Sequence, residues 1–394
     1  MDNLDFVNSI DDNINYREDQ KDLIQKAMEI SNGDPLNALQ YFVTCMNHEE
    51  YDIEFELVFT IPANEEVTIT LPIIETEPKD ELGYYVSWGN KITHNISVRA
   101  YEKIDKIKDY HIRFFGLGIS GFGMHSQEGD NEGYKKYLTK VISFGRLGHT
   151  FTSLEYAFYK CQNNFTVPRI LPSNITNMSS MFGWSIAFNQ PLEWDTSNVI
   201  NMSSMFSSCT NFNQPLEWNT SNVTDMSRMF CCCTNFNQPL ELNTSNVTNM
   251  CHMFIGCTKF NQPLEWNTSN VTNMRSMFYD CTNFNQPLEW DTSNVTDMNS
   301  MFIYCYNFNQ PLTAWNTSNV IYMDSMFFCC TRFNQPLTAW NTSNVINMSG
   351  MFNSCTNFNQ SLTEWDTTNV LKMWGMFSGC NISEENKPRF LNNL

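Results

Sequence analysis

The sequence lacks the features that mark membrane proteins, secreted proteins and nucleic-acid-binding proteins. No run of residues approaches the ~18 apolar positions of a membrane span, and the N-terminal stretch has neither the basic nor the apolar region of a signal peptide. Lys and Arg number only 23 against 42 Asp and Glu, which gives a net charge of −19. Because no basic stripe is present to neutralise phosphates, we expect no nucleic-acid partner. Because no apolar run is long enough, we expect no insertion into a membrane.

Groups of catalytic or metal-binding residues are also missing. The 6 histidines are scattered without ligand spacing, and no Ser-His-Asp or Cys-His arrangement is evident. Gly116, Gly118 and Gly121 match a G-x-G-x-x-G pattern, but a loop sequence follows where a phosphate site needs a helix. We therefore expect a glycine-rich strand exit there, and a chain that is not an enzyme and has no cofactor or small-molecule substrate.

A recurring unit dominates what is present. The chain holds 30 Phe, 22 Met and 14 Cys, and Met-Phe recurs at intervals of 24 and later 25 residues from Met181 to Met376. Ala157-Phe158 fits one period earlier, which gives about ten units. A fixed period of this length predicts stacked supersecondary units, each too small to bury its apolar face alone.

One unit, residues 212–235, shows the expected local structure. Leu216-Glu217-Trp218 alternates in polarity as a short strand does, and a turn sequence follows it. The apolar residues after that turn have helical spacing, which predicts a short helix or 3-10 turn. We therefore expect a leucine-rich-repeat-like solenoid with one short parallel strand per coil. Its Phe, Met, Val and Trp positions form buried ladders, and Leu242 interrupts the Trp ladder.

The unit N-T-S-N-V-T-x-M-x-x-M-F-x-x-C-x-x-F-N-Q-P-L, which recurs over about 154–380, resembles the BspA-type surface-protein repeat. That family is known from mycoplasma lipoproteins, other bacterial surface proteins, protists and large DNA viruses. The resemblance implies binding, adhesion or scaffolding, without catalytic residues.

The remaining sequence suggests three further segments beside the repeats at 131–380. Residues 1–50 form an acidic helical segment, and 20–46 within it resemble the last two helices of a ubiquitin-associated-type bundle. Residues 51–130 alternate with period two, which predicts a β-sandwich. That segment resembles a PKD-like module, although Trp88-Gly89-Asn90-Lys91 lacks the Asp and second Gly of its usual turn. Residues 381–394 form a polar tail.

Cysteines form a ladder of their own, with Ser185 in the one gap between Cys161 and Cys380. Adjacent coils lie about 4.8 Å apart, at the short end of the Cα separation that a disulfide prefers. Stacked free thiols, disulfides and a metal site are all compatible with the ladder. We favour free thiols and therefore an intracellular, reducing or virion-associated location.

A column of acidic residues is the candidate binding surface. In Leu-Glu-Trp the central residue points away from the core side chains. The column comprises Glu193, Glu217, Glu241, Glu265 and Glu289. It is interpreted either as a solvent-screened imprint of the repeat or as a docking stripe for a basic segment of a protein partner, with Ca²⁺ bridging as a variant. We expect a protein-interaction scaffold, or alternatively a surface adhesin exported without a recognised signal.

Overall fold

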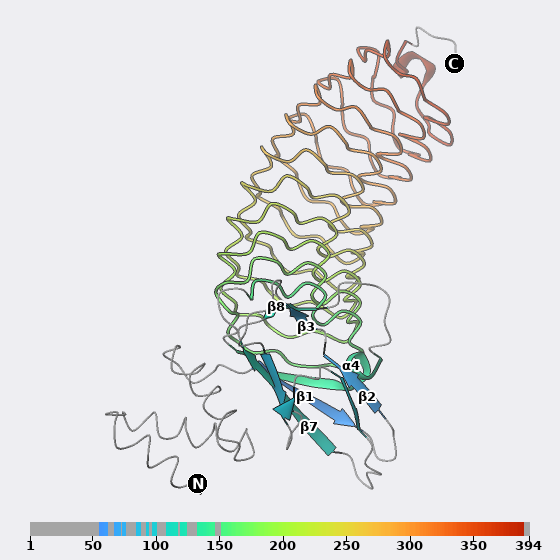
Figure 1. Ribbon diagram of the computed structural model, residues 1–394. Coiled ribbons are helices and arrows are strands. Elements are labelled where there is room, and N and C mark those ends of the chain that lie inside the picture. Colours follow the sequence, from blue (N-terminus) through green and yellow to red (C-terminus); the bar gives the residue numbers. More distant parts are fainter. Residues whose placement is uncertain are drawn as a thin grey trace, which may run out of the picture. The chain divides into compact units, whose positions relative to one another are not determined.

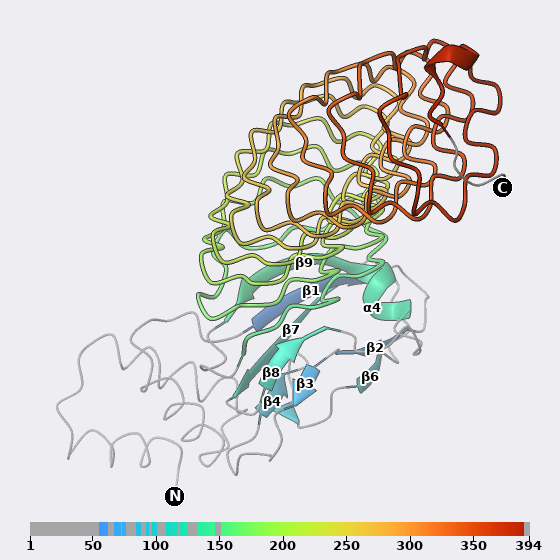
Figure 2. The same ribbon diagram turned by 90° about the horizontal axis from the view of Figure 1, so that it is seen from above.

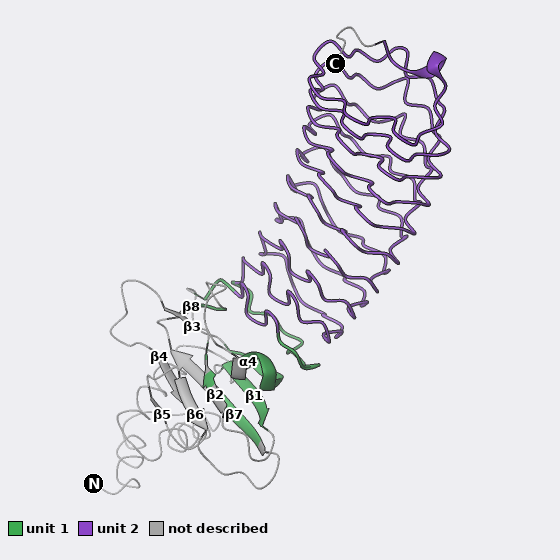
Figure 3. Cartoon of the chain, turned by 90° about the vertical axis from the view of Figure 1, so that its right-hand side faces the viewer, with its two compact units in different colours: residues 1–153, 161–174 green, residues 154–160, 175–394 purple. Residues whose placement is uncertain are grey.

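The structure is a computed structural model that describes residues 55–61, 67–71, 73–75, 84–87, 92–93, 97–100, 108–116, 119–123, 132–145 and 151–389. The chain divides into two compact units, coloured separately in Figure 3. The first comprises residues 1–153 and 161–174, and the second comprises residues 154–160 and 175–394. The helical segment expected at 1–50, the turn at Trp88–Lys91 and the last five residues of the tail lie outside the described residues.

The first unit is built from antiparallel strands. Its main sheet has the order β5-β4-β7-β1-β9, and β2 pairs with β6 and β3 with β8 in two smaller sheets. Figure 2 shows β9, β1 and β7 side by side. The strands and the helix of this unit are β1 (Phe55–Ile61), β2 (Val67–Thr70), β3 (Ile73–Glu75), β4 (Tyr84–Ser87), β5 (Ile92–Thr93), β6 (Ser97–Ala100), β7 (Lys108–Gly116), β8 (Ile119–Phe122), α4 (Glu132–Tyr137) and β9 (Leu138–Phe144).

Strand β1 lies at the centre of this unit because five of its seven residues are buried. The Phe55 ring lies 4.6 Å from that of Phe122 and 5.5 Å from that of Phe144, measured between ring centroids. Phe59 packs against Tyr134 of α4 at 5.6 Å. Aromatic burial of this extent gives the unit a hydrophobic core of its own.

Residues 132–145 belong to this unit, although the repeats were expected to begin at residue 131. Strand β9 pairs with β1, and its Lys140 forms a parallel bridge with Thr166. The Val141 N–H donates to the Thr166 carbonyl at 2.7 Å. Because Leu138, Val141 and Phe144 are buried in the core, β9 belongs to the sheet, and the repeats begin later in the chain.

In the second unit the repeat units lie in order along one axis, as coils stacked on one another (Figures 1 and 2). Single parallel bridges join each coil to the next, at the residue that precedes the first Met of Met-x-x-Met-Phe. From Asn201 the bridges continue to Asp225, Asn249 and Asn273. Alternate N–H groups beyond each bridge donate to carbonyls of the following coil, as from Phe206 to Met229 at 2.9 Å.

The other N–H groups of the same segment close two turns in tandem. The Met205 N–H donates to the Met202 carbonyl at 3.3 Å, and the Cys209 N–H donates to the Phe206 carbonyl at 2.9 Å. The third residue of each turn has positive φ, 57° at Ser204 and 62° at Ser208, as type II turns require. Over residues 151–389 the only helix is the 3-10 helix η1 (Glu384–Asn386), and no strand is longer than a single bridge.

The local elements therefore differ from those expected from the sequence. Leu216–Trp218 forms no strand, and the segment after Asn222 forms turns instead of a helix. The apolar spacing was ambiguous because two tandem four-residue turns repeat side chains at intervals of three and four, as a helix does.

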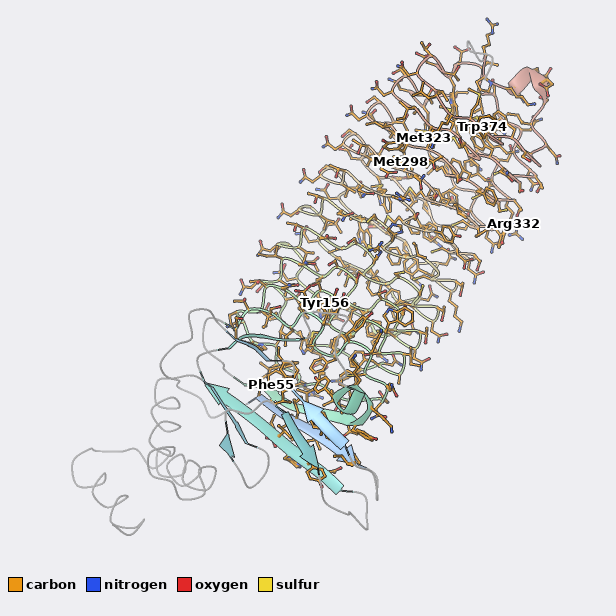
Figure 4. All side chains as sticks on the ribbon, turned by 45° about the vertical axis from the view of Figure 1, so that its right-hand side comes forward. Phe55, Tyr156, Met298, Met323, Arg332 and Trp374 are labelled. Atoms are coloured by element: carbon orange, nitrogen blue, oxygen red, sulfur yellow. The ribbon has the colours of Figure 1, made fainter. Side chains whose placement is uncertain are left out.

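The core of the second unit consists of side-chain ladders. Phe278 stacks on Phe254 at 5.7 Å and on Phe302 at 5.6 Å, with ring planes 7° and 4° apart. Met298 and Met323, labelled in Figure 4, are fully buried in successive coils. The extra residue of the later coils enters as a turn, in which the Trp315 N–H donates to the Leu312 carbonyl at 3.3 Å.

Candidate partner-binding surface

The five glutamates of the proposed column all lie on the surface of the second unit. In each coil the glutamate is exposed while the Leu before it and the residue after it are buried. At Glu217, for example, the flanking Leu216 and Trp218 are only 3% and 4% exposed. Two buried neighbours fix the backbone on either side, so each coil presents its carboxylate at the same place on the surface.

No opposite charge of the described residues compensates this column. None of the five glutamates takes part in an ion pair among the residues that the structure places. The basic side chains of these coils, Arg228, Lys259 and Arg275, occupy other positions of the repeat. The column therefore presents uncompensated negative charge to the solvent.

Two aspartates extend the acidic surface. Asp195 and Asp291 follow the Trp residues of their coils and are exposed. The Ser197 N–H donates to Asp195 Oδ1 at 3.0 Å and lowers the pKa of that carboxyl. Ser293, through its hydroxyl and its N–H, lowers the pKa of Asp291 in the same way. Both carboxylates are ionised at neutral pH and extend the negative surface at the two ends of the glutamate column.

The column ends where the extra residue enters the repeat. In the first such coil Thr313 and Ala314 occupy the exposed positions between the buried Leu312 and Trp315. The next coil repeats the pair as Thr338 and Ala339, and an exposed acid returns only at Glu364. The uninterrupted column is thus confined to the coils between residues 188 and 292.

Other recurring polar residues bond the coils to one another. Asn189 Oδ1 accepts the Asn213 N–H at 2.9 Å, and the Gln214 amide donates to the Asn189 carbonyl at 3.2 Å. Buried Thr220 donates its hydroxyl to the Asn243 carbonyl at 2.9 Å. Because these side chains satisfy backbone and side-chain groups of a neighbouring coil, their recurrence is explained by stacking.

The cysteine ladder has a structural role that sequence reasoning missed. None of the 13 cysteines of the described residues forms a disulfide. Buried Cys257 donates its S–H to the Phe230 carbonyl at 3.0 Å, and the coils around it repeat the bond. Ser185 makes the same bond to the Phe158 carbonyl at 2.6 Å, which explains the gap in the ladder. Burial raises the pKa of Cys257, so the sulfur keeps the proton that it donates.

Motifs with possible catalytic or metal-binding chemistry do not converge. His111 Nδ1 lies 2.8 Å from Glu56 Oε1, while His252 lies in the second unit. Gly116 ends β7, and the residues that follow Gly118 form β8 instead of a helix. In the described part of the chain no group of three or more His, Cys, Asp and Glu could hold a metal ion. Within the same residues no helix is long and apolar enough to cross a membrane.

Stacked units of 24 and 25 residues define a tandem-repeat protein. The chain belongs to the family described as Mycoplasma protein of unknown function, DUF285, whose matches cover residues 152–242, 216–289, 233–306 and 288–390. Together they span more than half of the sequence. No curated protein matches the chain, and no solved structure matches it.

Proposed function

We propose that the chain is a leucine-rich-repeat-like solenoid of the BspA type and acts as a non-enzymatic scaffold. It binds a protein partner through Glu193, Glu217, Glu241, Glu265 and Glu289. The single observation that carries the proposal is that these side chains recur at one exposed position without bonding to a neighbouring coil.

Rigidity of the backbone supports this assignment. The Trp indoles beneath the column stack on either side of Leu242, as Trp266 does on Trp290 at 6.3 Å with planes 2° apart. The Trp290 Nε1–H also donates to the Leu264 carbonyl at 3.0 Å. A surface held on a packed core loses little conformational entropy when it binds, because the spacing of its carboxylates is already fixed by the stacked coils.

The chemistry of the column selects a basic partner. An extended segment rich in Lys or Arg places positive charges at regular intervals, so that its side chains can pair with successive carboxylates of the column. Each exposed ion pair contributes about 0.2–1 kcal/mol, so three pairs together contribute about 1.5 kcal/mol. That amount corresponds to a roughly tenfold change in affinity.

The test uses a short Lys- and Arg-rich peptide, titrated calorimetrically into the whole protein at low salt. Glu217→Gln, Glu241→Gln and Glu265→Gln combined should weaken binding about tenfold, and added salt should weaken binding to the wild type. The control combines Asp280→Asn, Glu384→Gln and Glu385→Gln, which removes equal charge outside the column and should have little effect. Equal loss in both triple variants would mean that net charge alone attracts the peptide, and no loss would place binding elsewhere.

Location separates this scaffold from the alternative surface adhesin. Free thiols throughout the described residues are expected in a reducing compartment, which supports an intracellular or virion-associated scaffold. Antibody against residues 160–380 should then stain cells only after permeabilisation, or stain purified particles. Staining of intact cells would favour the adhesin.

A further inference from the structure

Two cysteines with side-by-side thiols stand apart from the buried ladder. Cys231 and Cys232 are the two central residues of the turn that the Cys233 N–H closes onto the Phe230 carbonyl at 3.0 Å. Their Sγ atoms are 3.7 Å apart, and both side chains are half-buried. The positive φ of Cys232, 61°, belongs to the turn. The turn thus holds two accessible thiols together.

The neighbouring coil leaves this pair open on one side. Gly256 occupies the position of Cys232 in the next coil, and a Cβ atom there would lie 3.6 Å from Cys232 Sγ. The same position carries Ser208 in the coil before and Asp280 two coils after Cys232. Glycine therefore removes the one side chain that would stand directly over the thiol.

The electrostatics of the pair favour a thiolate at Cys232. The hydrogen bond from Cys231 lowers the pKa of Cys232 to about 6, and the Ser208 hydroxyl acts in the same direction against burial and the Asp280 charge. The pKa of Cys231 is raised, since it donates to that thiolate. Ladder thiols differ, because burial raises the pKa of Cys233 and its S–H donates to the Phe206 carbonyl.

We propose that Cys231 and Cys232 form a thiol–disulfide exchange site for small-molecule disulfides of the glutathione class. The Cys232 thiolate attacks one sulfur of the disulfide, forms a mixed disulfide and releases one thiolate. Cys231 then loses its proton to solvent and attacks Cys232 Sγ, which releases the second thiolate. The two cysteines are oxidised to one disulfide, and the small molecule is reduced to two thiols.

Adjacent positions make this oxidation reversible. Neighbouring Cα atoms are about 3.8 Å apart, below the ~4.4 Å lower limit of ordinary disulfides. The disulfide is therefore strained, and strained disulfides are the readily reduced ones. A low-pKa, accessible cysteine beside a resolving cysteine is the arrangement of redox-responsive sites.

The test exposes the whole native protein to glutathione disulfide at pH 6 and follows intact mass and peptide maps. Wild type should form the Cys231–Cys232 disulfide without retaining glutathione. Cys231→Ser keeps a hydrogen-bond donor but not the resolving sulfur, so it should accumulate a glutathione adduct on Cys232. A thiolate with pKa about 6 should react about tenfold faster at this pH than an ordinary thiol, after allowance for its lower intrinsic nucleophilicity.

Cys329 and Cys330 supply an internal control in a later coil. Cys329 occupies the turn position of Cys232, but buried Cys330 donates into the core, to the Phe302 carbonyl at 2.9 Å. Adducts at Cys329 should therefore persist in the wild type. The proposal is overturned if wild type retains glutathione at Cys232, or if Cys232 in Cys231→Ser reacts no faster than Cys329. Circular dichroism checks that each variant is folded.

Discussion

Completion of the Trp ladder at position 242 should stabilise the second unit. Every Trp from Trp218 to Trp365 donates its indole N–H to a Leu carbonyl of the preceding coil. Leu242 is the exception, and among the described residues no hydrogen bond ends on the Leu216 carbonyl oxygen that a Trp there would reach. Leu242→Trp restores the bond and places an indole between Trp218 and Trp266.

The expected gain follows from the neighbouring coils. Trp290 stacks on Trp266 at 6.3 Å and on Trp315 at 6.4 Å, with planes 2° and 4° apart. Each aromatic pair contributes about 0.5–1.5 kcal/mol beyond its burial, and the hydrogen bond contributes about 1 kcal/mol. Because Leu242 already packs in this position and is only 6% exposed, we expect a net gain of about 2 kcal/mol.

Equilibrium unfolding of the whole protein in urea measures this gain, and calorimetry gives the corresponding shift in Tm. For a unit of this size about 2 kcal/mol raises Tm by roughly 4–8 °C. Leu242→Phe is the matched control, since Phe stacks but has no N–H, and it should recover only the stacking part. Trp290→Leu, which removes two stacks and one bond, should destabilise the protein by at least the amount gained.

Refutation is direct. If Leu242→Trp unfolds at the same or a lower denaturant concentration than wild type, the site does not accept an indole in ladder geometry. If Leu242→Phe matches Leu242→Trp, the indole N–H contributes nothing and the regular bond to the Leu carbonyl has no energetic role.

Three further predictions concern the same stack. Phe302→Ala should cost ~3–5 kcal/mol, whereas Phe377→Ala should cost less because Phe377 stacks on one ring and Phe302 on four; equal urea midpoints would contradict a linear stack. Gly256, at φ 68°, should accept Ser with a cost of about 1 kcal/mol but lose about 2 kcal/mol or more as Val, and equal midpoints would exclude backbone strain. Burial raises the pKa of Cys281 and its ladder neighbours. The stability that these thiols contribute is therefore complete below the unfolded thiol pKa of about 8.5. Above that pH the free energy of unfolding should fall by about 1.4 kcal/mol per pH unit for each thiol. Cys281→Ser should reduce that slope, and unfolding midpoints that do not change between pH 7 and 10 would contradict it.

Sequence reasoning found the ladders because stacking repeats one environment in every coil. Val223, Met226 and Phe230 recur in the sequence and are fully buried in the structure. Burial depends only on the identity and spacing of these residues, which the sequence records. Glu217 could be placed on the surface for the same reason, since it separates two buried side chains.

Backbone conformation was harder to predict. The segment from Met202 to Cys209 has apolar spacing that fits a helix, yet alternate N–H groups leave the coil and bond to the next one. Glycine signals positive φ in a sequence, but it occupies these positions in only a few coils, as at Gly256, and most coils place residues such as Ser, Arg, His or Cys there. The stack supplies inter-coil bonds that hold these residues in the left-handed region, so local propensity could not reveal the turns.

The thiol pair was missed for a related reason. In a strand or a helix, neighbouring members of the run Cys231–Cys233 would not share a face. In the turn, however, the two central side chains lie together and Cys233 points into the core. The positive φ at Cys232 produces this arrangement. A strand or helix would have separated the two sulfurs.

Comparison of the coils with one another separates the residues needed for stacking from those available for binding. Thr220, Asn213 and Gln214 recur and bond to the next or the preceding coil, so stacking alone accounts for their repetition. Glu217 and its equivalents recur without such a bond, and Thr and Ala replace them in the first two coils that contain one more residue. Like charges repeated along adjacent coils repel each other, so stacking disfavours the column instead of requiring it. Repetition that stacking does not need supports the proposal that a partner binds this column, and this makes the column the first surface to mutate.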